Sequence, residues 1–324
     1  MFTMFTNKIN NMNKAFVFPG QGSQTVGMGK ELYENFSVAK EVFKEVDDAL
    51  GKNLSKIIFE GPQDLLTQTE NAQPAIMCTS IAFLRVLEKE TGKRIDELCN
   101  FVAGHSLGEY SALCASEALT LSDTARLLKI RGESFAEAGK HSKGAMVALV
   151  GATIEQAEEV ANKARQAGEV CQVANDNTVG QVVLSGNENS IDKAVEVATE
   201  MKIKRAIKLQ VSGAFHSELM KPAVESMQKA LADVKISTPK VSLIANVYAD
   251  KISNPEKIKE SLLKQITSRV RWRETMLLFE KNAVEEIVEI GAGKVLTGMV
   301  AKTTPNIKTF TINSIDSLNE YKNR

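Results

Sequence analysis

The sequence is poor in the residues that most often mark metal, redox or disulfide chemistry. Its 324 residues include only three histidines and four cysteines, and the cysteines show neither a C-x-x-C pair nor a Cys/His spacing typical of a metal site. Isolated cysteines of this kind are typical of a reducing compartment, so a cytoplasmic location is expected. The sequence therefore predicts no metal site and no disulfide framework.

Net charge and long apolar runs are also missing. The chain carries 40 Lys and Arg residues against 40 Asp and Glu residues, so no overall field attracts it to nucleic acid or to a membrane surface. No apolar run approaches the roughly 18 residues that a membrane-spanning helix needs. The first thirteen residues, MFTMFTNKINNMN, resemble neither a secretory signal nor an Arg-rich transit peptide, and they are expected to form a flexible extension, residues 1–13.

What the sequence does contain is an alternation of short apolar runs and helical patterns, which predicts an α/β fold. Over residues 143–211 the order is βαββαβ, the pattern of a ferredoxin-like module. Alternating α/β character resumes after it. This small domain is therefore predicted to be inserted into a large, hydrolase-like and mainly parallel α/β domain formed by residues 14–142 and 212–324. A cleft between the two domains is the expected place for a site.

One short stretch, GHSLG, places a serine between two glycines where a strand pattern changes to a helix pattern. The preceding CNFVA has the composition of a buried strand, and the following EYSALCASEAL has that of a helix. A sharp strand–turn–helix reversal exposes its central side chain beside the N–H groups of the helix start. We therefore interpret Ser106 as the nucleophile of an elbow, with Gly104 and Gly108 allowing close backbone approach. An ordinary strand–helix turn is the alternative.

A serine hydroxyl needs a base to take its proton, and histidine is the commonest base at neutral pH. His105 is adjacent to the serine, where side chains on a sharp turn diverge, and His141 lies in a polar segment typical of a solvated side chain. His216 lies where the inserted domain should return the chain to the large domain, beside the expected cleft. His216 is therefore the candidate base, and a satisfied surface histidine is the alternative.

No Asp or Glu between Ser106 and His216 stands out as the third member of a triad. A backbone carbonyl can orient an imidazole in the same way, so the missing acid weakens a hydrolase interpretation without excluding Ser106 and His216 as nucleophile and base. An oxyanion needs two N–H donors. The N–H of Leu107 follows from the elbow itself, and the glycine-rich PGQGSQ loop, with Gly20 and Gly22, is the candidate source of the second.

An arginine lies on a helix face that should be buried. In the segment LTLSDTARLLKIRGESFAEAG, apolar residues recur at a helical spacing that brings Arg131 or Gly132 to the same face. These apolar residues are Leu121, Ala125, Leu128 and Phe135. A buried guanidinium needs an anion, and its planar fork binds a carboxylate through two hydrogen bonds. Arg131 is therefore a candidate binder of a substrate carboxylate, and snorkelling to solvent is the alternative.

Five segments occur together in an order that resembles a known family. They are PGQGSQ at 19–24, GHSLGEY at 104–110, the arginine of KIRGE, AFHS at 214–217 and EIGAGKVLTGM at 289–299. The chain resembles the malonyl-CoA:acyl carrier protein transacylases and the acyltransferase domains of fatty acid and polyketide synthases. The resemblance extends from residue 14 to about residue 300, and GHSLGEY followed by the arginine is its most specific part.

The resemblance implies an activity. A malonyl group would pass from malonyl-CoA to the phosphopantetheine thiol of acyl carrier protein, through a malonyl-serine intermediate, and so supply fatty acid chain elongation. Ser106 would carry the ester and His216 would be the base. The main-chain carbonyl of Gln265, in an L-x-x-Q segment, would orient the imidazole.

The resemblance also implies two oxyanion donors and a substrate clamp. Leu107 and Gln21 would give backbone N–H groups to the oxyanion, and Arg131 would bind the malonyl carboxylate. No metal or tightly bound cofactor is implied, and the enzyme is expected to act as a monomer. One alternative is a serine esterase or lipase, which would have no use for a buried arginine. Another is a non-catalytic docking protein that keeps the fold.

Recognition of an acyl carrier protein, which is acidic, requires a local basic patch on a chain that is neutral overall. Two clusters are candidates, one closing the inserted domain and one following Gln265. They are Lys202, Lys204, Arg205 and Lys208, and Arg269, Arg271 and Arg273. An ordinary solvated face is the alternative for each.

Overall fold

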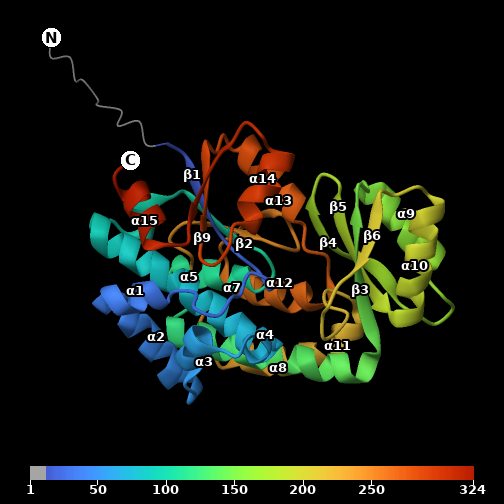
Figure 1. Cartoon of the computed structure of the whole chain (residues 1–324), viewed down its shortest axis with the longest axis horizontal. Helices are drawn as coiled ribbons and strands as arrows, with labels where there is room; N and C mark the ends of the chain where they lie inside the picture. Colours follow the sequence, from blue (N-terminus) through green and yellow to red (C-terminus); the bar gives the residue numbers. More distant parts are fainter. Residues whose placement is uncertain (1–11) are drawn as a thin grey trace, which may run out of the picture.

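The computed structural model describes residues 12–324, which form two units built on separate sheets (Figure 1). The expected flexible extension over residues 1–13 therefore lies outside the described residues, except at its last two positions. Asn13 is part of the ordered chain: its Nδ2 donates to the carbonyl of Asn282 at 2.8 Å, and its own carbonyl accepts the N–H of Glu285 at 2.8 Å. The ordered chain thus begins at least one residue earlier than expected.

The large domain contains a six-stranded sheet. Its strands are β1 (Lys14–Phe18), β2 (Phe101–Gly104), β7 (Ser242–Ala245), β8 (Asp250–Ile252), β9 (Glu286–Ile290) and β10 (Lys308–Ile312). They lie in the order β10-β9-β1-β2-β7-β8, and neighbours are parallel except β8, which is antiparallel to β7. The carboxyl ends of the parallel strands therefore meet at one edge, where α/β sheets bind their ligands.

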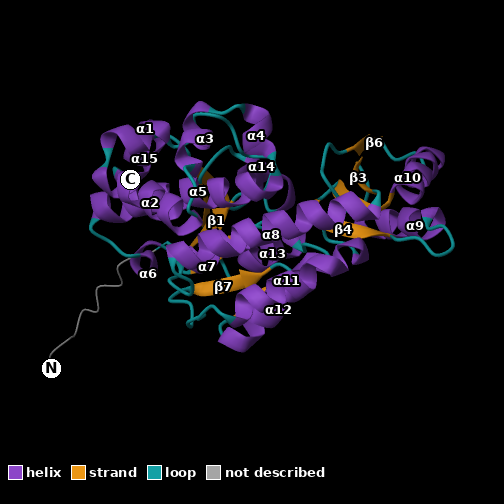
Figure 2. Ribbon diagram, turned by 90° about the horizontal axis from the view of Figure 1, so that it is seen from below, coloured by secondary structure: helices purple, strands orange, loops and turns teal. Residues whose placement is uncertain are grey.

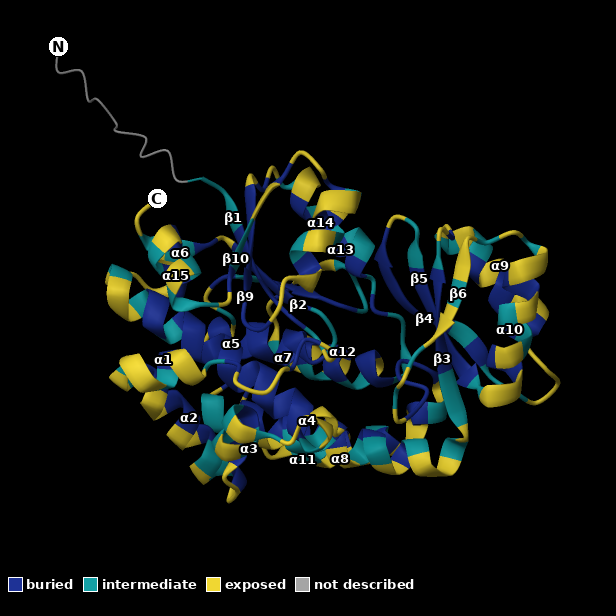
Figure 3. Ribbon diagram, viewed as in Figure 1, coloured by how far each residue is buried: buried dark blue, intermediate teal, exposed yellow. Residues whose placement is uncertain are grey.

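Helices cover both faces of this sheet. One face carries α13 (Trp272–Lys281) and α14 (Val295–Thr303), and the other carries α5 (Thr69–Thr91), α7 (Gly108–Ala115) and α15 (Ile315–Lys322). This arrangement follows from the strands, because alternate residues of β1 belong to two separate hydrophobic cores. Figure 3 shows α5 and α7 almost wholly buried at the centre of the domain.

The other helices of the large domain surround this central layer. Figure 2 shows α8 running toward the small domain with α11 beside it. The connection between β1 and β2 contains α1 to α6. The return from the small domain to β7 contains η1 and α11, and α12 follows β8. Their bounds are α1 (Lys30–Asn35), α2 (Ser37–Leu50), α3 (Leu54–Glu60), α4 (Gln63–Thr67), α6 (Ile95–Leu98), α8 (Leu121–Ser142), η1 (Glu218–Met220), α11 (Lys221–Ala232) and α12 (Pro255–Thr267).

The small domain is a βαββαβ unit inserted between α8 and η1. Its elements are β3 (Gly144–Val150), α9 (Ile154–Ala164), β4 (Cys171–Thr178), β5 (Gln181–Asn187), α10 (Glu188–Glu200) and β6 (Arg205–Lys208). The strands form an antiparallel sheet in the order β4-β5-β3-β6, with α9 and α10 packed over a separate core. The opposite face, which includes Met146 and Val183, belongs to the core of the large domain. The predicted α/β fold with an inserted ferredoxin-like unit is confirmed.

Strand β4 connects the two domains directly. The N–H of Asp176 donates to the carbonyl of Val270 at 2.9 Å, and the N–H of Val270 donates to the carbonyl of Ala174 at 2.8 Å. The buried carboxylate of Asp176 also pairs with Arg273 of α13, with 2.8 Å between Oδ2 and Nη2. Backbone pairing and a partly buried ion pair therefore hold the small sheet against the large domain.

Candidate active site

Ser106 lies in the turn between β2 and α7, at the carboxyl edge of the large sheet. Its φ of 54° is left-handed, a conformation that costs a non-glycine residue about 1–3 kcal/mol and is concentrated at active sites. The turn is tight. A Cβ on Gly104 would lie 1.9 Å from the carbonyl carbon of Gly108, and one on Gly108 would lie 2.3 Å from the carbonyl oxygen of Phe18. Both positions require glycine, and the turn has the geometry of a nucleophile elbow.

A hydrogen-bonded chain of three residues starts at the serine. Ser106 Oγ lies 2.8 Å from His216 Nε2. On the other side of the ring, His216 Nδ1 lies 2.8 Å from the carbonyl oxygen of Gln265, near the end of α12. Because a carbonyl oxygen only accepts, Nδ1 carries the hydrogen and Nε2 is left to accept the serine proton. The arrangement is that of nucleophile and base, with a carbonyl where a triad has a carboxylate.

The surroundings of His216 keep its ring uncharged. The side chain is 3% exposed, and its φ of 56° is left-handed like that of the serine. Burial, reinforced by the positive charge of Arg131, lowers the pKa of His216 to about 3. The ring therefore stays neutral at physiological pH, which is the protonation state that a general base requires.

Arg131 projects from α8 into the same site and is 1% exposed, so it does not snorkel to solvent. Its Nη1 donates to Gln73 Oε1 at 2.7 Å, and its Nη2 donates to Ser106 Oγ at 3.0 Å and to Gln265 Oε1 at 2.9 Å. The guanidinium carbon lies 4.3 Å from the centre of the Phe135 ring. These partners are all neutral, and no carboxylate in the described part of the chain forms an ion pair with Arg131. A buried cation that has no directly bonded carboxylate within residues 12–324 is suited to bind an anion.

The two predicted oxyanion donors belong to segments that meet at the elbow. Leu107 lies in the turn before α7, and Gln21 lies in the loop after β1. This loop contacts the elbow, since a Cβ on Gly20 would lie 2.9 Å from the carbonyl oxygen of His105. Within residues 12–324 neither backbone N–H donates a hydrogen bond to the protein. Both are therefore available to a negative charge that develops on the substrate.

The side chains of the site surround a cavity of about 370 Å³ between the two sheets. The large domain contributes Ser106, Arg131 and His216 to its wall, and the small domain contributes Asn177 and Val183. The cavity lies at the carboxyl ends of the large-sheet strands and at a domain junction, which are both preferred places for ligand sites.

The other two histidines have different surroundings. His105 Nε2 lies 2.8 Å from Asn177 Oδ1 of the small domain, and its ring packs edge-on against Trp272, with 5.7 Å between ring centres. Burial lowers the pKa of His105. His141 is exposed and lies 2.9 Å from Glu137 Oε1. His216 is thus the histidine bonded to the serine, whereas His105 links the elbow to the small domain.

Sequence reasoning missed Asn246, which clamps the elbow. Its Oδ1 accepts the N–H of Ser106 at 2.8 Å, and its Nδ2 donates to the carbonyl of Gly104 at 2.7 Å. Asn246 directly follows β7, so a signal was present: a polar residue at the carboxyl end of an apolar strand. Gln73, the buried partner of Arg131, was also missed.

Gln172 of β4 was missed as well. Its Nε2 donates to the carbonyl oxygens of His216 at 3.3 Å and Thr267 at 3.2 Å, and its Oε1 accepts the N–H of Glu218 at 3.1 Å. The side chain thus holds the loop that carries the base against the helix end that carries Gln265. No local pattern points to it, because its partners lie 44 to 95 residues away.

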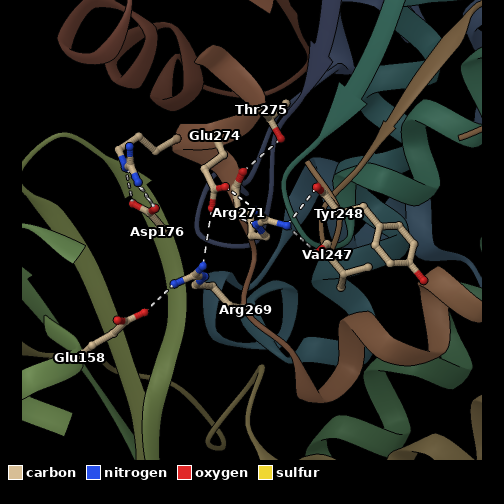
Figure 4. A network of polar contacts seen from close by, with 9 residues as sticks. Glu158, Asp176, Val247, Tyr248, Arg269, Arg271, Glu274 and Thr275 are labelled. Atoms are coloured by element: carbon tan, nitrogen blue, oxygen red, sulfur yellow. Dashed lines mark hydrogen bonds and ion pairs between the residues drawn. The ribbon is translucent and has the colours of Figure 1, made fainter. Parts of the chain in front are cut away.

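The arginine cluster that follows Gln265 is not a free basic patch, contrary to expectation. All three arginines pair with carboxylates, two of which belong to the small domain (Figure 4). The pairs are Arg269–Glu158, Arg271–Glu274 and Arg273–Asp176. Their positive charge is therefore neutralised locally, which removes this cluster as a candidate docking surface for an acidic partner.

The lysine-rich cluster keeps more of its charge. Lys208 pairs with Asp192. Lys202, Lys204 and Arg205 are exposed, and within residues 12–324 none of them forms an ion pair with a carboxylate. These three residues remain a candidate basic patch on the small domain.

Three further observations concern residues 12–324. No group of three or more His, Cys, Asp and Glu side chains there is arranged to hold a metal ion. No helix in this range has both the length and the apolar character needed to cross a membrane. The four cysteines are buried free thiols.

A mainly parallel α/β sheet that presents a serine hydrogen-bonded to a histidine is typical of enzymes that act on acyl groups, both hydrolases and acyltransferases. Comparison with known proteins agrees. A family model described as "Acyl transferase domain" matches residues 15–316. The malonyl CoA-acyl carrier protein transacylase of Bacillus subtilis (strain 168) is 45% identical over 304 residues, which cover 94% of either chain.

Solved structures give the same result. The acyl-carrier-protein-S-malonyltransferase from Bartonella henselae is 49% identical with a TM-score of 0.92, covering 96% of this chain and 98% of that one. A second match is a chain from a structure described as a "type II PKS acyl-carrier protein in complex with its malonyl-transacylase". It is 33% identical with a TM-score of 0.91, covering 96% of this chain and 99% of that one. The chain is an acyltransferase and belongs to the family of malonyl CoA-acyl carrier protein transacylases.

Proposed function

We propose that this acyltransferase moves a malonyl group from malonyl-CoA to the phosphopantetheine thiol of acyl carrier protein, through a malonyl-serine intermediate, and so supplies fatty acid chain elongation. The names of its relatives support the donor and the acceptor. The observation in this chain that carries the proposal is Arg131, a buried guanidinium whose Nη2 lies 3.0 Å from the serine oxygen and whose partners are neutral. A malonyl thioester brings a carboxylate to that position, and an acetyl thioester does not.

The first half-reaction acylates the serine. His216 Nε2 takes the proton of Ser106 Oγ while this oxygen attacks the thioester carbonyl of malonyl-CoA. The N–H groups of Leu107 and Gln21 bind the oxyanion. The C–S bond then breaks, the proton passes from His216 to the sulfur, and coenzyme A leaves as the thiol. Arg131 binds the malonyl carboxylate through its planar fork.

The second half-reaction returns the serine. The phosphopantetheine thiol of the carrier protein gives its proton to His216, and its sulfur attacks the carbonyl of the malonyl-serine. The same two N–H groups bind the oxyanion. The C–O bond breaks, Ser106 recovers its proton from His216, and malonyl leaves as a thioester of the carrier protein. This order is ping-pong.

Two other functions would use parts of the same site. A serine esterase or lipase would share the nucleophile and base, but a neutral ester offers no counter-ion to the buried Arg131. A non-catalytic docking protein would not need Ser106 Oγ and His216 Nε2 at 2.8 Å. Malonyl transfer accounts for all three residues.

We also propose that the reaction needs no metal or tightly bound cofactor, because a nucleophile, a base and oxyanion donors suffice for acyl transfer. The named groups all belong to one chain, so we propose a monomer, and we propose the cytoplasm as its location. Light scattering and cell fractionation test the last two points.

Transfer of malonyl and of acetyl groups to acyl carrier protein tests the proposal in the wild type and in Arg131→Ala. The wild type should transfer malonyl and should hydrolyse malonyl-CoA only slowly. Arg131→Ala should lose malonyl transfer by roughly 10²-fold or more, the scale of truncating one partner of a buried charge pair. It should keep or gain acetyl transfer, because acetyl has no carboxylate to bind.

Arg126→Ala is the matched control. Arg126 lies on the same helix but is exposed, and it pairs with Asp123 at 2.9 Å. Its removal should leave both activities unchanged. Equal loss of the two activities in Arg131→Ala would mark Arg131 as structural, and rapid hydrolysis of malonyl-CoA by the wild type would favour the esterase.

Docking of the carrier protein should depend on the basic patch of Lys202, Lys204 and Arg205. This patch precedes and begins β6, whose chain continues into the cavity wall at Leu209 and Val211. Reversing the three charges to Glu should raise the apparent KM for carrier protein, most steeply at low salt, since the Debye length is about 8 Å at 0.15 M.

Acylation by malonyl-CoA should stay almost unchanged in this triple variant, because that step does not involve the carrier protein. Lys56→Glu, at an exposed position on α3, is the control and should not alter the KM. If the triple variant keeps the wild-type KM and salt dependence, the carrier protein docks elsewhere.

A further inference from the structure

A buried carboxylate lies beneath the elbow and has no part in the two half-reactions. Glu109 is the one charged side chain of α7, a helix of eight residues that are all buried. It is 1% exposed. Its Oε2 accepts two hydrogen bonds, from Gln265 Nε2 at 2.7 Å and from the backbone N–H of Asn246 at 3.1 Å. Burying a charge costs folding free energy unless the charge is paired or hydrogen-bonded, so a carboxylate at this position calls for a functional explanation.

The bond to Gln265 connects Glu109 to the reaction centre through a single amide group. On one side, Gln265 Nε2 donates to Glu109 and, at 3.1 Å, to the carbonyl oxygen of Ser106. On the other side, Gln265 Oε1 accepts from Arg131 Nη2 at 2.9 Å. The same Nη2 donates to Ser106 Oγ at 3.0 Å. A continuous chain therefore runs from Glu109 through Gln265 and Arg131 to the nucleophile.

The orientation of this amide matters because its NH₂ only donates and its oxygen only accepts. If the Gln265 amide were reversed, its NH₂ would face a guanidinium that also only donates. Its oxygen would face the Glu109 carboxylate, which when ionised also only accepts. Both hydrogen bonds would be replaced by repulsion. An ionised Glu109 therefore reinforces the orientation with the oxygen toward Arg131. A protonated Glu109, which can donate, no longer opposes the reversed amide, and only Arg131 and the Ser106 carbonyl then select the orientation.

We propose that Glu109 is a positioning residue for the substrate clamp: as a carboxylate it holds the Gln265 amide in the orientation that places Arg131 beside Ser106, where a malonyl carboxylate binds. This inference rests on the proposed malonyl transfer. Glu109 itself touches neither the substrate nor the reacting atoms. Removing its charge should therefore slow acylation by acyl groups that carry a carboxylate and leave acylation by other acyl groups unchanged.

The protonation state of Glu109 makes this positioning sensitive to pH. Burial raises the pKa of Glu109 to about 7, against the hydrogen bonds it accepts and the positive charge of Arg131, which lower it. The charged and titratable groups that face it are Arg131 from α8 and Tyr110 from its own helix. His216 does not titrate in this range, because its pKa is about 3. Acid should therefore weaken the clamp by protonating Glu109.

Glu109→Gln, which keeps the shape and removes the charge, tests the proposal. The readout is the ratio of kcat/KM for acylation by malonyl-CoA to that for acetyl-CoA, measured from about pH 5.5 to about pH 8.5. Both substrates share coenzyme A, so the ratio isolates the carboxylate. In the wild type the ratio should rise through about pH 7. In Glu109→Gln it should be flat and, at the alkaline end, lower by roughly tenfold or more, the scale of one charge-assisted hydrogen bond.

A second variant tests whether Glu109 acts through the amide. Gln265→Met removes the amide but keeps the main-chain carbonyl that orients His216. If the two residues act in one chain, adding Glu109→Gln to Gln265→Met should lower the ratio little further. Full addition of the two losses would overturn the proposed route.

Glu289→Gln is the matched control. Glu289 of β9 is also fully buried. Its Oε2 accepts the N–H of Thr297 at 2.8 Å, and its Oε1 has no hydrogen-bond partner in the described part of the chain. Glu289→Gln should leave the ratio and its pH dependence as in the wild type. Thermal unfolding of Glu109→Gln and Glu289→Gln compares how much each substitution lowers stability.

The positioning role is wrong if Glu109→Gln keeps the wild-type ratio or lowers both acylations equally. A wild-type ratio that is constant over the pH range also overturns it. Failure of the wild type to form a malonyl-enzyme would instead defeat the proposed function.

Discussion

Ser106→Ala is expected to abolish the malonyl-enzyme. Incubated with malonyl-CoA, the wild type should gain the mass of one malonyl group, whereas the variant should keep its unmodified mass. The reason is that the proposed mechanism forms the ester on the Oγ atom, which lies 2.8 Å from His216 Nε2. Transfer to the carrier protein should fall to background as well, because a ping-pong reaction passes through the acyl-serine. Intact-protein mass spectrometry and a transfer assay measure the two effects.

Ser111→Ala is the matched control for this experiment. Ser111 lies on α7 and is buried, and its hydroxyl has no hydrogen-bond partner among residues 12–324. Its loss should leave the malonyl-enzyme intact. A malonyl adduct on Ser106→Ala would assign the nucleophile to another residue, and carrier-protein transfer without any adduct would show a direct, single-step reaction.

The turn at Ser106 and the burial of Arg131 were predictable from the sequence, because a local pattern determines each position. The turn at Ser106 follows from two glycines between a strand pattern and a helix pattern. The burial of Arg131 follows from the helical spacing of apolar residues around it. The inserted domain was likewise predictable, because the order βαββαβ is a property of consecutive segments.

The contacts that support these residues were not predictable in this way, since they join distant segments. Gln265 Nε2 meets the Glu109 carboxylate across 156 residues of chain, and Asn246 Oδ1 meets the Ser106 N–H across 140. A buried Glu in an otherwise uncharged helix does signal an internal hydrogen-bond network. It does not reveal which residues complete that network, because only the fold brings them together.

For the arginine cluster, the sequence suggested a feature that the structure does not contain, namely a free basic patch. Three arginines close together in the sequence suggest a basic patch, but their charge depends on partners that the local sequence does not contain. Glu158 reaches Arg269 across 111 residues, and Asp176 reaches Arg273 across 97. Both carboxylates come from the small domain, so these ion pairs belong to the domain junction and not to a docking surface.

The structure stabilises two unfavourable backbone conformations at the reaction centre. Ser106 and His216 have φ values of 54° and 56°, and each such residue persists only where its surroundings determine it. Asn246 binds the N–H of Ser106, and Gln172 binds the carbonyl of His216. The serine and the base are thus each held by an amide side chain, Asn246 from the residue after β7 and Gln172 from β4, and their 2.8 Å contact depends on both segments.

His216→Ala is expected to slow acylation by malonyl-CoA by roughly 10²–10⁴-fold, the usual contribution of a positioned general base. Single-turnover acylation followed by mass spectrometry measures this rate. The loss should not be recovered by raising the pH within the neutral range, because the variant lacks the acceptor at Nε2. His141→Ala, which removes an exposed histidine paired with Glu137, should acylate at the wild-type rate.

The same variant should change how stability depends on pH. In the folded protein, burial and the charge of Arg131 hold the pKa of His216 at about 3, whereas an unfolded histidine has a pKa of about 6.5. Between these values the unfolded chain binds a proton that the folded protein does not, so the free energy of unfolding contributed by His216 falls as the pH decreases from about 6.5 toward 3. His216→Ala removes this term, and its stability in urea should therefore decline less between about pH 6.5 and pH 4.5 than that of the wild type. If the stability of His216→Ala depends on pH as that of the wild type does, the histidine is readily protonated in the folded state. If His216→Ala is acylated at a near-wild-type rate, His216 is not the base.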